Sequence, residues 1–403
     1  MDSLKINKIS KPVNGNIQIT GSKSETNRLL ILQQSYPNLK IENCSNSDDS
    51  VLLQKALESN SSEINIGHAG TAMRFLTAYF SVKENSEIIL TGSERMKNRP
   101  IKILVDALRD LGASISYIEK DGFPPLRIKS AKLVKNEIEI DGNVSSQYIS
   151  ALLLIAPTLK RGLVLKFKGE VTSVPYIKMT LKLLDSVGIS YRWVGKTIVV
   201  SPKRAIKNKI IEIESDWSSA SYYYSLSALS PNSEITLSTY KNNSLQGDSI
   251  LATMYSRLGV ETIFEDNKLL LKNNNTVINR GLNLNLKSAP DIAQTIVVTC
   301  FGLGIECNIK GLHTLKIKET DRLIALKNEL EKLGGEIEIT NESLHLKRSR
   351  IINENICIST YDDHRMAMAF APLATKVAIA IEDPNVVSKS YPNFWEDFRK
   401  ITS

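Results

Sequence analysis

Residues 138–147 read IEIDGNVSSQ: a short alternating strand, Ile138-Glu139-Ile140, leads into a turn of small and polar residues and then into a helix start. Strands of the same kind recur along the chain and begin at Ile17, Ile64, Ile138, Ile211, Leu282 and Ile356. After the second, the starting positions are separated by 71 to 74 residues. The pattern therefore predicts repeated copies of one α/β unit.

A second pattern marks the ends of the helices that separate these strands. An apolar residue followed by glycine occurs at Leu111-Gly112, Val187-Gly188, Leu258-Gly259 and Leu333-Gly334. Glycine readily takes the left-handed conformation that ends a helix, so each pair predicts a helix end. The repeat of about 73 residues is longer than solenoid periods, which favours small subdomains, three in each of two domains.

Length and composition agree with two globular domains. The 403 residues are 42% hydrophobic and 23% charged, and about 200 residues per domain is an ordinary size. No apolar run reaches the ~18 residues of a membrane span, and the first residues lack a secretion signal, so we expect a cytosolic protein with no membrane partner. None of the four cysteines forms a C-x-x-C pair, which favours buried free thiols over a metal site.

The formal net charge of +8 is compatible with a nucleic acid partner, an acidic small molecule or a lysine-rich surface. Many of the cations lie in turns at predicted helix starts. Residues 21–28, GSKSETNR, place Lys23, Ser24 and Arg28 beside the free N–H groups of a helix start, an arrangement that binds phosphate or carboxylate. A capped helix with two solvated cations is the alternative.

Further turns in the first half repeat this chemistry. Residues 67–74, GHAGTAMR, include Gly70, where the backbone could approach a ligand closely. Residues 95–100, RMKNRP, include Arg99 and two more cations, which could also be a solvated patch. Hydroxyl and amide groups stand at two more predicted helix starts, where simple N-capping is the alternative. They are Ser145, Ser146, Gln147 and Ser173.

The second half contains the densest charges. Residues 318–322, KETDR, put Lys318 and Arg322 four apart, so we expect them on one helix face with an anion or carboxylate between them. A solvated ion-pair cluster is the alternative. Residues 361–365, YDDHR, precede an apolar helical run and indicate a site at a helix start. Lys389, taken alone, is typical of a surface lysine.

Asp291 is the candidate acid or base. It precedes the apolar stretch of residues 296–300, so it is either an N-cap or a general base that faces a cleft. No Ser/His/Asp triad, metal-ligand cluster or phosphate-binding P-loop is evident in the sequence.

Taken together, these segments resemble one family, the 5-enolpyruvylshikimate-3-phosphate synthases. The resemblance covers residue 21 to about residue 398. It rests on GSKSETNR at 21–28, GTAMR at 70–74, RMKNRPI at 95–101, SSQY at 145–148, KETDRL at 318–323 and DHRMAM at 363–368. Each segment is modest alone, but their combination in this order is highly specific.

The resemblance implies an α/β fold with two inverse α/β barrel-like domains. Each domain would contain three βαβαββ repeats, and the active site would lie in the interdomain cleft, which closes on the ligands. Residues 1–19 and 215–403 would form one discontinuous domain with the C-terminal half of the site. Residues 20–214 would form an inserted domain that binds shikimate 3-phosphate.

By the same resemblance, the site residues divide between two substrates. The expected shikimate 3-phosphate contacts are Lys23, Ser24, Arg28, Ser145, Ser146, Gln147, Ser173, Asp291, Thr314 and Lys318, with Tyr176 nearby. The expected phosphoenolpyruvate contacts are Lys23, Gly70, Arg99, Gln147, Arg322, Arg365 and Lys389, with His68 and His364 in support. A ligand with a phosphate and a carboxylate requires such a set of cations.

The implied reaction transfers the enolpyruvyl group of phosphoenolpyruvate to the 5-hydroxyl of shikimate 3-phosphate, in the shikimate pathway to chorismate and the aromatic amino acids. Asp291 would take the hydroxyl proton, and Glu319 or Lys23 would protonate the methylene carbon. The cations expected to stabilise the departing phosphate are Arg322, Arg365 and Lys389. The resemblance implies no metal or organic cofactor and only these two small-molecule partners, and we expect a monomer.

Four positions depart from the usual family pattern. His68 stands where asparagine is usual, Phe75 where proline is usual, Thr314 where some relatives have asparagine, and Asn98 where an acidic residue is common. These departures concern the seating of phosphoenolpyruvate rather than the reaction. Gly70 is retained, and because alanine there would crowd the herbicide glyphosate, we predict a glyphosate-sensitive enzyme.

Two other functions compete with this one. The sister transferase that acts on UDP-N-acetylglucosamine typically has a reactive cysteine in the loop before Arg99-Pro100, and residues 93–98, SERMKN, contain none. A basic nucleic-acid-binding protein needs a continuous basic face with aromatic platforms, but aromatic residues are only 6% of the chain. An inactive paralogue is disfavoured because the expected catalytic positions are all filled.

Overall fold

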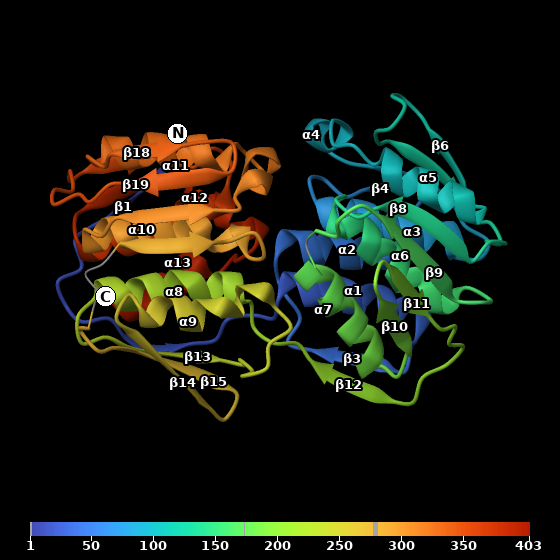
Figure 1. The fold of residues 1–403 in the computed structure, drawn as a ribbon, viewed down its shortest axis with the longest axis horizontal. Coiled ribbons are helices and arrows are strands. Elements are labelled where there is room, and N and C mark those ends of the chain that lie inside the picture. Colours follow the sequence, from blue (N-terminus) through green and yellow to red (C-terminus); the bar gives the residue numbers. More distant parts are fainter. Residues whose placement is uncertain (1, 173, 277–280) are drawn as a thin grey trace. The chain divides into compact units, whose positions relative to one another are not determined.

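The structure is a computed structural model and describes residues 2–172, 174–276 and 281–403. The chain forms two compact units (Figure 1): the discontinuous unit, Met1–Thr20 with Glu214–Ser403, and the inserted unit, Gly21–Ile213. The boundaries predicted after residues 19 and 214 lie one residue away from these. Each unit is built from small sheets with two helices per repeat.

The inserted unit contains two complete βαβαββ repeats. The first consists of β4 (Glu63–Asn65), α3 (Gly70–Val82), β5 (Glu87–Thr91), the short α4 (Glu94–Lys97), α5 (Lys102–Leu111), β6 (Ser114–Tyr117) and β7 (Leu126–Lys129). The second consists of β8 (Glu137–Asp141), α6 (Ser146–Ile155), η1 (Ala156–Thr158), β9 (Leu163–Lys168), α7 (Val174–Ser186), β10 (Tyr191–Val194) and β11 (Thr197–Val200). The sheets have the orders β4-β5-β7-β6 and β10-β11-β9-β8, with the first two strands of each repeat parallel.

A third, smaller repeat completes the inserted unit. It consists of α1 (Lys23–Ser35), β3 (Leu39–Glu42), α2 (Asp48–Glu58) and β12 (Lys209–Glu212). β12 comes from the far end of the unit and pairs in parallel with β3, so it takes the place of the first strand. Within the described residues this sheet has two strands, so this copy of the repeat lacks the hairpin that the other two have.

The discontinuous unit contains three repeats. The first consists of β2 (Asn14–Ile17), α8 (Trp217–Leu229), β13 (Glu234–Ser238), η2 (Gly247–Ile250), α9 (Leu251–Ser256), β14 (Val260–Glu265) and β15 (Lys268–Asn273). The second consists of β16 (Leu282–Asn285), η3 (Pro290–Ile292), α10 (Ala293–Leu303), β17 (Cys307–Lys310), η4 (His313–Ile317), α11 (Arg322–Lys332), β18 (Ile337–Ile339) and β19 (Ser343–Leu346). The third consists of β20 (Ile356–Ile358), α12 (His364–Phe370), η5 (Ala371–Thr375), β21 (Ile379–Glu382), η6 (Pro384–Lys389) and α13 (Phe394–Thr402), and β1 (Ser3–Ile6) adds an antiparallel strand to β21.

The chain crosses between the units twice, and each crossing separates a strand from the helix that follows it. β2 leads into α1 but pairs with β13 in the discontinuous unit. β12 leads into α8 but pairs with β3 in the inserted unit. The strand predicted to begin at Ile17 is wrong in position, because pairing with β13 runs over Asn14–Ile17 and stops there. The other predicted strand starts lie in β4, β8, β12, β16 and β20.

The first helix of each repeat forms the core of its unit. α8, α10 and α12 contact one another, and almost all of their residues are buried. A helix that is buried on almost all sides has to be covered by other elements, here by the neighbouring helices and sheets. The predicted helix ends are confirmed, because Gly112, Gly188, Gly259 and Gly334 have positive φ angles and follow α5, α7, α9 and α11.

Two predictions about side-chain burial have different outcomes. All four cysteines are free thiols, and Cys300 and Cys307 are buried, as expected. Cys44 and Cys357 are exposed, which corrects the prediction that all four are buried. Cys357 lies in β20, the edge strand of its sheet, and its side chain faces outward because neighbouring strand residues alternate between faces.

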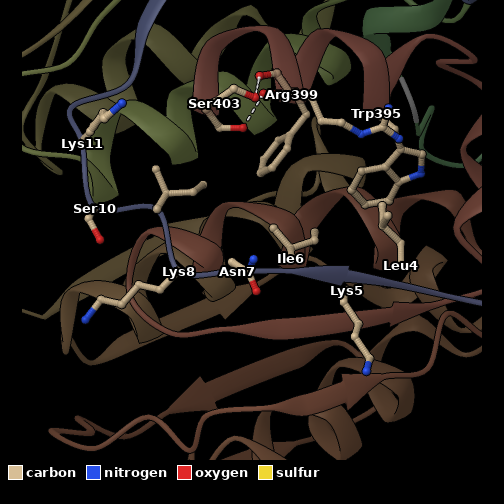
Figure 2. Close-up of a pocket in the computed structure, with 13 residues that line it drawn as sticks. Leu4, Lys5, Ile6, Asn7, Lys8, Ser10, Lys11, Trp395, Arg399 and Ser403 are labelled. Atoms are coloured by element: carbon tan, nitrogen blue, oxygen red, sulfur yellow. Dashed lines mark hydrogen bonds between the residues drawn. The ribbon is translucent and has the colours of Figure 1, made fainter.

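The described helices include none that combines the length and the apolar character needed to span a membrane. A cavity of about 430 Å³ lies between the segment Leu4 to Lys11 and α13 (Figure 2). None of the predicted site residues lines this cavity, so the candidate site has to be built from the helix starts instead.

Candidate active site

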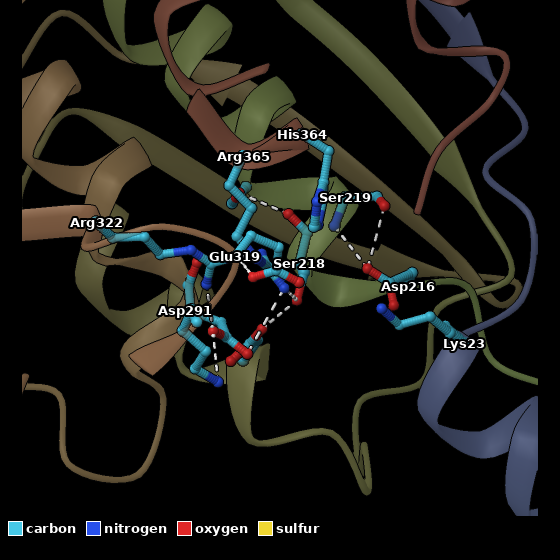
Figure 3. A network of polar contacts seen from close by, with 12 residues as sticks. Lys23, Asp216, Ser218, Ser219, Asp291, Glu319, Arg322, His364 and Arg365 are labelled. Carbon is cyan, nitrogen blue, oxygen red and sulfur yellow. Dashed lines mark hydrogen bonds and ion pairs between the residues drawn. The ribbon is translucent and has the colours of Figure 1, made fainter. Parts of the chain in front are cut away.

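Predicted residues of the discontinuous unit come together at the N-terminal ends of its helices (Figure 3). Asp291 lies in η3, Glu319 lies in the bend before α11, and Arg322 is the first residue of α11. Arg365 lies in the first turn of α12, and Lys389 ends η6. These segments follow the parallel pairs β16–β17 and β20–β21, whose carboxyl ends carry the helix starts.

Arg322 is the centre of this group. Its side chain is 2% exposed. Nη1 donates to Asp291 Oδ1 at 2.9 Å, and Nη2 donates to Glu319 Oε2 at 2.7 Å. Nε donates to Asp363 Oδ2 at 2.6 Å, and Nη2 also donates to Asp363 Oδ1 at 3.2 Å. Burial alone would lower the pKa of Arg322, but the three carboxylates raise the pKa above its ordinary value.

Three more cations surround the same carboxylates. Lys389 Nζ lies 2.6 Å from Glu319 Oε1, and Lys318 Nζ lies 3.3 Å from Asp291 Oδ1. Arg365 Nη2 lies 3.7 Å from Asp291 Oδ2, and its Nη1 donates to the Asp291 carbonyl at 3.1 Å. Together with Arg322 these cations outnumber the carboxylates, and the partly exposed ones can exchange a carboxylate for an incoming anion.

Asp291 is ionised in this arrangement. Burial alone would raise its pKa, but Lys318, Arg365 and Arg322 outweigh burial and hold the pKa well below the ordinary aspartate value. The side chain makes no N-capping hydrogen bond to η3 or α10, so the capping alternative for this residue is wrong. A carboxylate with so low a pKa is a weak base as long as all three cations remain against it.

Glu319 has a similar environment. Burial would raise its pKa, but Arg322, Lys389 and His364 lower the pKa well below the ordinary glutamate value. Glu319 therefore carries a negative charge and cannot donate a proton until its cationic neighbours are engaged elsewhere.

The acidic residues beside the cations also fix the helix starts. Asp321 accepts hydrogen bonds from the first-turn N–H groups of α11, and Asp363 accepts one from Arg365 N at 2.9 Å. The expectation that Lys318 and Arg322 share one helix face is wrong, because α11 begins at Arg322. A carboxylate, that of Asp291, does lie between the two cations, and the burial of Arg322 contradicts the alternative of a solvated cluster.

The inserted unit holds a second, less charged group of predicted residues. Lys23 Nζ lies 3.7 Å from Asp49 Oδ2, whose side chain is 7% exposed. Arg99 lies against Gly70, where an added Cβ would come within 2.9 Å of the Arg99 Cζ atom. Gly70 therefore leaves the space that the guanidinium of Arg99 occupies.

Arg28 is buried and is engaged by its own unit. Nε donates to Thr180 Oγ1 at 2.7 Å, Nη1 donates to the Ser24 carbonyl at 2.7 Å, and Nη2 donates to Ser150 Oγ at 3.0 Å. Burial lowers the pKa of Arg28 to about 10. These contacts tie α1 to α6 and α7, which gives Arg28 a structural role beside the predicted substrate contact.

Other predicted residues of this unit lie at helix starts. Ser145 is the N-cap of α6 and accepts from Gln147 N at 3.3 Å, so the capping interpretation holds for this residue. The Gln147 side chain donates to Thr71 Oγ1 at 3.3 Å and thereby connects α6 to α3. Ser146 follows at the first position of α6, and Tyr176 lies half-buried in the first turn of α7. Ser173 lies outside the described residues.

The remaining predicted residues differ in burial. His68 is exposed in the turn before α3, whereas His364 is buried, with Nδ1 3.7 Å from Asp363 Oδ1. Thr314 lies in η4, and its Oγ1 is buried with no hydrogen-bond partner among the described residues. Among all the residues that the structure describes, no group of three or more His, Cys, Asp or Glu side chains is arranged to hold a metal ion.

Sequence reasoning gave no role to several residues of these groups. Asp49 pairs with Lys23, and Asp363 binds Arg322. Ser218 accepts a hydrogen bond from Arg365 and donates one to Asp248. Position within the repeat is the signal that would have found Ser218, because it stands in the first turn of a core helix, as Ser24 and Arg365 do.

The fold is that of enolpyruvyl transferases. EPSP synthase from Acinetobacter baumannii superposes with a TM-score of 0.83 at 19% sequence identity and covers 100% of this chain and 98% of its own. The enolpyruvyl transferase NikO from Streptomyces tendae superposes with a TM-score of 0.76 at 13% identity and covers 99% and 97%. The expected two-domain inverse α/β barrel architecture is confirmed by these likenesses.

Sequence comparison then gives the family. The profile of EPSP synthase (3-phosphoshikimate 1-carboxyvinyltransferase) matches residues 37–398. The 3-phosphoshikimate 1-carboxyvinyltransferase of Bacteroides fragilis strain YCH46 is 46% identical over 392 residues, 96% of this chain and 95% of its own. That of Histophilus somni strain 2336 is 33% identical over 441 residues, 100% and 99% of the two chains. The chain belongs to the EPSP synthase family.

Membership of this family makes the chain a transferase of the shikimate pathway to the aromatic amino acids. The family predicted from the sequence motifs is confirmed. The alternatives of a UDP-N-acetylglucosamine transferase and of a nucleic-acid-binding protein are not favoured.

Proposed function

We propose that the chain transfers the carboxyvinyl group of phosphoenolpyruvate to the 5-hydroxyl of shikimate 3-phosphate and releases inorganic phosphate. The network around Arg322 is the observation that supports this most directly. Its cations are held by carboxylates that an anionic substrate can displace, and guanidinium groups match phosphate and carboxylate oxygens in pairs.

Phosphoenolpyruvate would bind to the cations of this network. Arg322, Arg365 and Lys389 would contact its phosphate and carboxylate, and Arg99 beside Gly70 would contribute from the inserted unit. Lys389 would leave Glu319, its partner at 2.6 Å, when the substrate arrives. The exchange keeps each cation paired and so avoids the cost of an uncompensated buried charge.

Binding of the substrates would also activate Asp291. Lys318 and Arg365 hold its pKa down in the arrangement described above. When substrate anions engage these cations and water is excluded, the opposing fields weaken and the pKa of Asp291 rises toward the working pH. Asp291 would then accept the proton of the 5-hydroxyl as the oxygen attacks C2 of phosphoenolpyruvate.

The remaining steps of the reaction are an addition to phosphoenolpyruvate followed by an elimination of phosphate. A new bond forms between the 5-oxygen and C2 while the methylene carbon C3 gains a proton from Glu319 or Lys23. The tetrahedral adduct then loses a proton from C3, the bond from C2 to the phosphate oxygen breaks, and phosphate leaves against the cations. Both donors remain open, and Glu319 is the one that contacts two proposed phosphate ligands, Arg322 and Lys389.

The inserted unit would bind shikimate 3-phosphate through helix starts. Lys23, Ser24, Ser145, Ser146, Gln147 and Ser173, with Lys318, Asp291 and Thr314 from the discontinuous unit, are the proposed contacts. Arg28 would support them by fixing α1 against α6 and α7. We propose that both groups of residues act on one pair of substrates, in a monomeric, cytosolic enzyme.

Phosphate release tests the proposed function. Purified protein with phosphoenolpyruvate and shikimate 3-phosphate should release phosphate, and replacement of the second substrate by UDP-N-acetylglucosamine should abolish the release. Asp291→Ala should remove turnover while the circular dichroism spectrum stays unchanged. Glu336→Ala, which alters an exposed carboxylate of the same unit, is the matched control. A near-normal rate in Asp291→Ala would rule out Asp291 as the base.

A further inference from the structure

Two polar residues, Ser218 and Asp248, form a chain of hydrogen bonds with Arg365. Nη2 of Arg365 donates to Ser218 Oγ at 3.3 Å, and Ser218 Oγ donates to Asp248 Oδ2 through a short hydrogen bond. Figure 3 shows Ser218 and Arg365 in the same network. Ser218 lies in the first turn of α8 and Asp248 in η2, so the contact joins segments far apart in the sequence to α12.

The direction of these hydrogen bonds depends on the charge of Asp248. A serine hydroxyl has one proton to donate, whereas a guanidinium only donates. When Asp248 is ionised it accepts the serine proton, and the serine oxygen is then free to accept from Arg365. When Asp248 is protonated, it can donate to Ser218, and the serine proton is then free to turn toward Arg365, which cannot accept it.

We propose that Ser218 and Asp248 are positioning residues for Arg365, with ionised Asp248 orienting the Ser218 hydroxyl so that the guanidinium is held in place to bind the substrate phosphate. The phosphate as ligand of Arg365 rests on the proposed function; the hydrogen-bonded chain itself does not. Asp248 acts through Ser218 and does not touch the substrate.

The environment of Asp248 makes this orientation sensitive to pH. Asp248 is 6% exposed, and burial raises the pKa of its carboxyl to about 6. Asp291 of η3 and Asp216 before α8 also raise the pKa, whereas Arg365 of α12 and the Ser218 hydrogen bond lower it. A fixed negative charge in this position is costly, and an asparagine would fill the same space at lower cost. The carboxylate is therefore explained by a task that needs its charge.

The test compares Asp248→Asn with the wild type at several pH values. The amide of asparagine is uncharged at every pH and, like a protonated aspartate, can donate to Ser218. Phosphate groups also titrate near pH 6, so a pH profile of the wild type alone is ambiguous. That ionisation is common to both proteins and cancels in the ratio of their KM values for phosphoenolpyruvate.

We expect this ratio, variant over wild type, to be about tenfold at pH 8 and to fall to about threefold at pH 5.5, where most of the wild type carries a protonated Asp248. A loss of packing would give a ratio that does not change with pH. A ratio that is constant, or below one because Asp248 merely repels the substrate phosphate, would overturn the proposal.

A double-mutant cycle tests whether the effect passes through the serine. In a Ser218→Ala background, Asp248→Asn should change KM for phosphoenolpyruvate by less than about twofold, because the connecting hydroxyl is gone. If Asp248→Asn keeps its full effect without that hydroxyl, the relay is wrong. Asp397→Asn is a matched control, because Asp397 of α13 also has a raised pKa but accepts its hydrogen bond from Tyr391 instead of Ser218.

Binding of inorganic phosphate separates this inference from the proposed function. Phosphate should raise the thermal unfolding midpoint of the wild type more than that of Asp248→Asn at pH 8, and the difference should shrink at pH 5.5. If the wild type binds phosphate in this way but releases none from phosphoenolpyruvate and shikimate 3-phosphate, the proposed function fails and the positioning role stands. Equal stabilisation of the two proteins at pH 8 would overturn the positioning role.

Discussion

Nη1 of Arg322 lies 2.9 Å from Oδ1 of Asp291, so the proposed general base is held in an ion pair before any substrate is present. The same carboxylate is 3.3 Å from Lys318 Nζ and 3.7 Å from Arg365 Nη2. In the proposed function, Asp291 is therefore both the group that would react and the group that occupies the proposed anion-binding cations. These two roles have opposite effects on substrate binding and on turnover, which makes them separable by mutation.

Asp291→Asn should lower kcat while leaving the KM for phosphoenolpyruvate equal to or below that of the wild type. Loss of a general base costs about 10²- to 10⁴-fold in rate. Loss of its negative charge removes a competitor of the substrate for Lys318 and Arg365, so anion binding should not weaken. Steady-state kinetics with phosphoenolpyruvate varied at saturating shikimate 3-phosphate measures both effects. A raised KM with unchanged kcat would contradict both roles.

Arg322→Lys should destabilise the discontinuous unit. Arg322 is 2% exposed and bonds to three carboxylates, whereas an ammonium group cannot reproduce the geometry of the guanidinium. Breaking such a buried network costs about 3–5 kcal/mol, measurable by urea unfolding at pH 7. Arg350→Lys, at an exposed position of the same unit, should change stability by less than about 0.5 kcal/mol.

Lowering the pH should reduce the difference in unfolding free energy between the wild type and Arg322→Lys. The folded-state pKa values of Asp291 and Glu319 lie below their ordinary values. The stability that they contribute is therefore present above about pH 4 and is lost as the pH falls below it. In the variant the carboxylates are paired more weakly, so protonation removes less stability from the variant than from the wild type. The two unfolding free energies should therefore converge below about pH 4. A difference that stays constant down to pH 3 would show that these pairs do not stabilise the fold.

We expect the wild type to be inhibited by glyphosate. Gly70→Ala should weaken the binding of both phosphoenolpyruvate and glyphosate. The new Cβ would lie 2.9 Å from the Arg99 Cζ, so the guanidinium has to move. We expect the KM for phosphoenolpyruvate to rise about tenfold and the inhibitory concentration of glyphosate to rise further. Gly281→Ala is the control, since its nearest new contact would be 3.5 Å. A wild type that is unaffected by millimolar glyphosate would contradict the predicted sensitivity.

Local patterns were sufficient to predict the repeats. Isoleucine-rich strands and helix-ending glycines are properties of a few neighbouring residues, and Gly112 and Gly188 have the positive φ angles that they predict. Strand pairing is a property of distant residues. The sequence around Ile17 could not show that β2 pairs with β13 more than 200 residues away, or that the strand ends where this pairing ends.

The same distinction applies to the candidate site. KETDR and YDDHR were identified because their charges are dense, but the helix start at Arg322 and the three-carboxylate contact depend on how separate repeats pack. Ser218 and Asp248 were missed because a serine in a first helical turn and an aspartate beside a glycine are ordinary in sequence. The positioning role proposed for them follows only from their contact with Arg365.

Asp248→Asn should stabilise the ligand-free protein at neutral pH, although it weakens phosphate binding. The pKa of Asp248 is raised from its ordinary value of 3.8 to about 6, so ionised Asp248 disfavours the folded state above pH 6. That cost is absent below about pH 3, where the group is protonated in both states, and grows to about 3 kcal/mol above pH 6. The stability of the variant should therefore exceed that of the wild type at pH 7.5, and the difference should shrink to less than about 1 kcal/mol at pH 4. Urea unfolding at both pH values measures this difference, and effects of Asp291 and Glu319 cancel because both proteins contain them. A variant that is less stable at pH 7.5 would mean that the Asp248 carboxylate contributes to folding, and the presence of a buried charge at this position would then need no functional explanation.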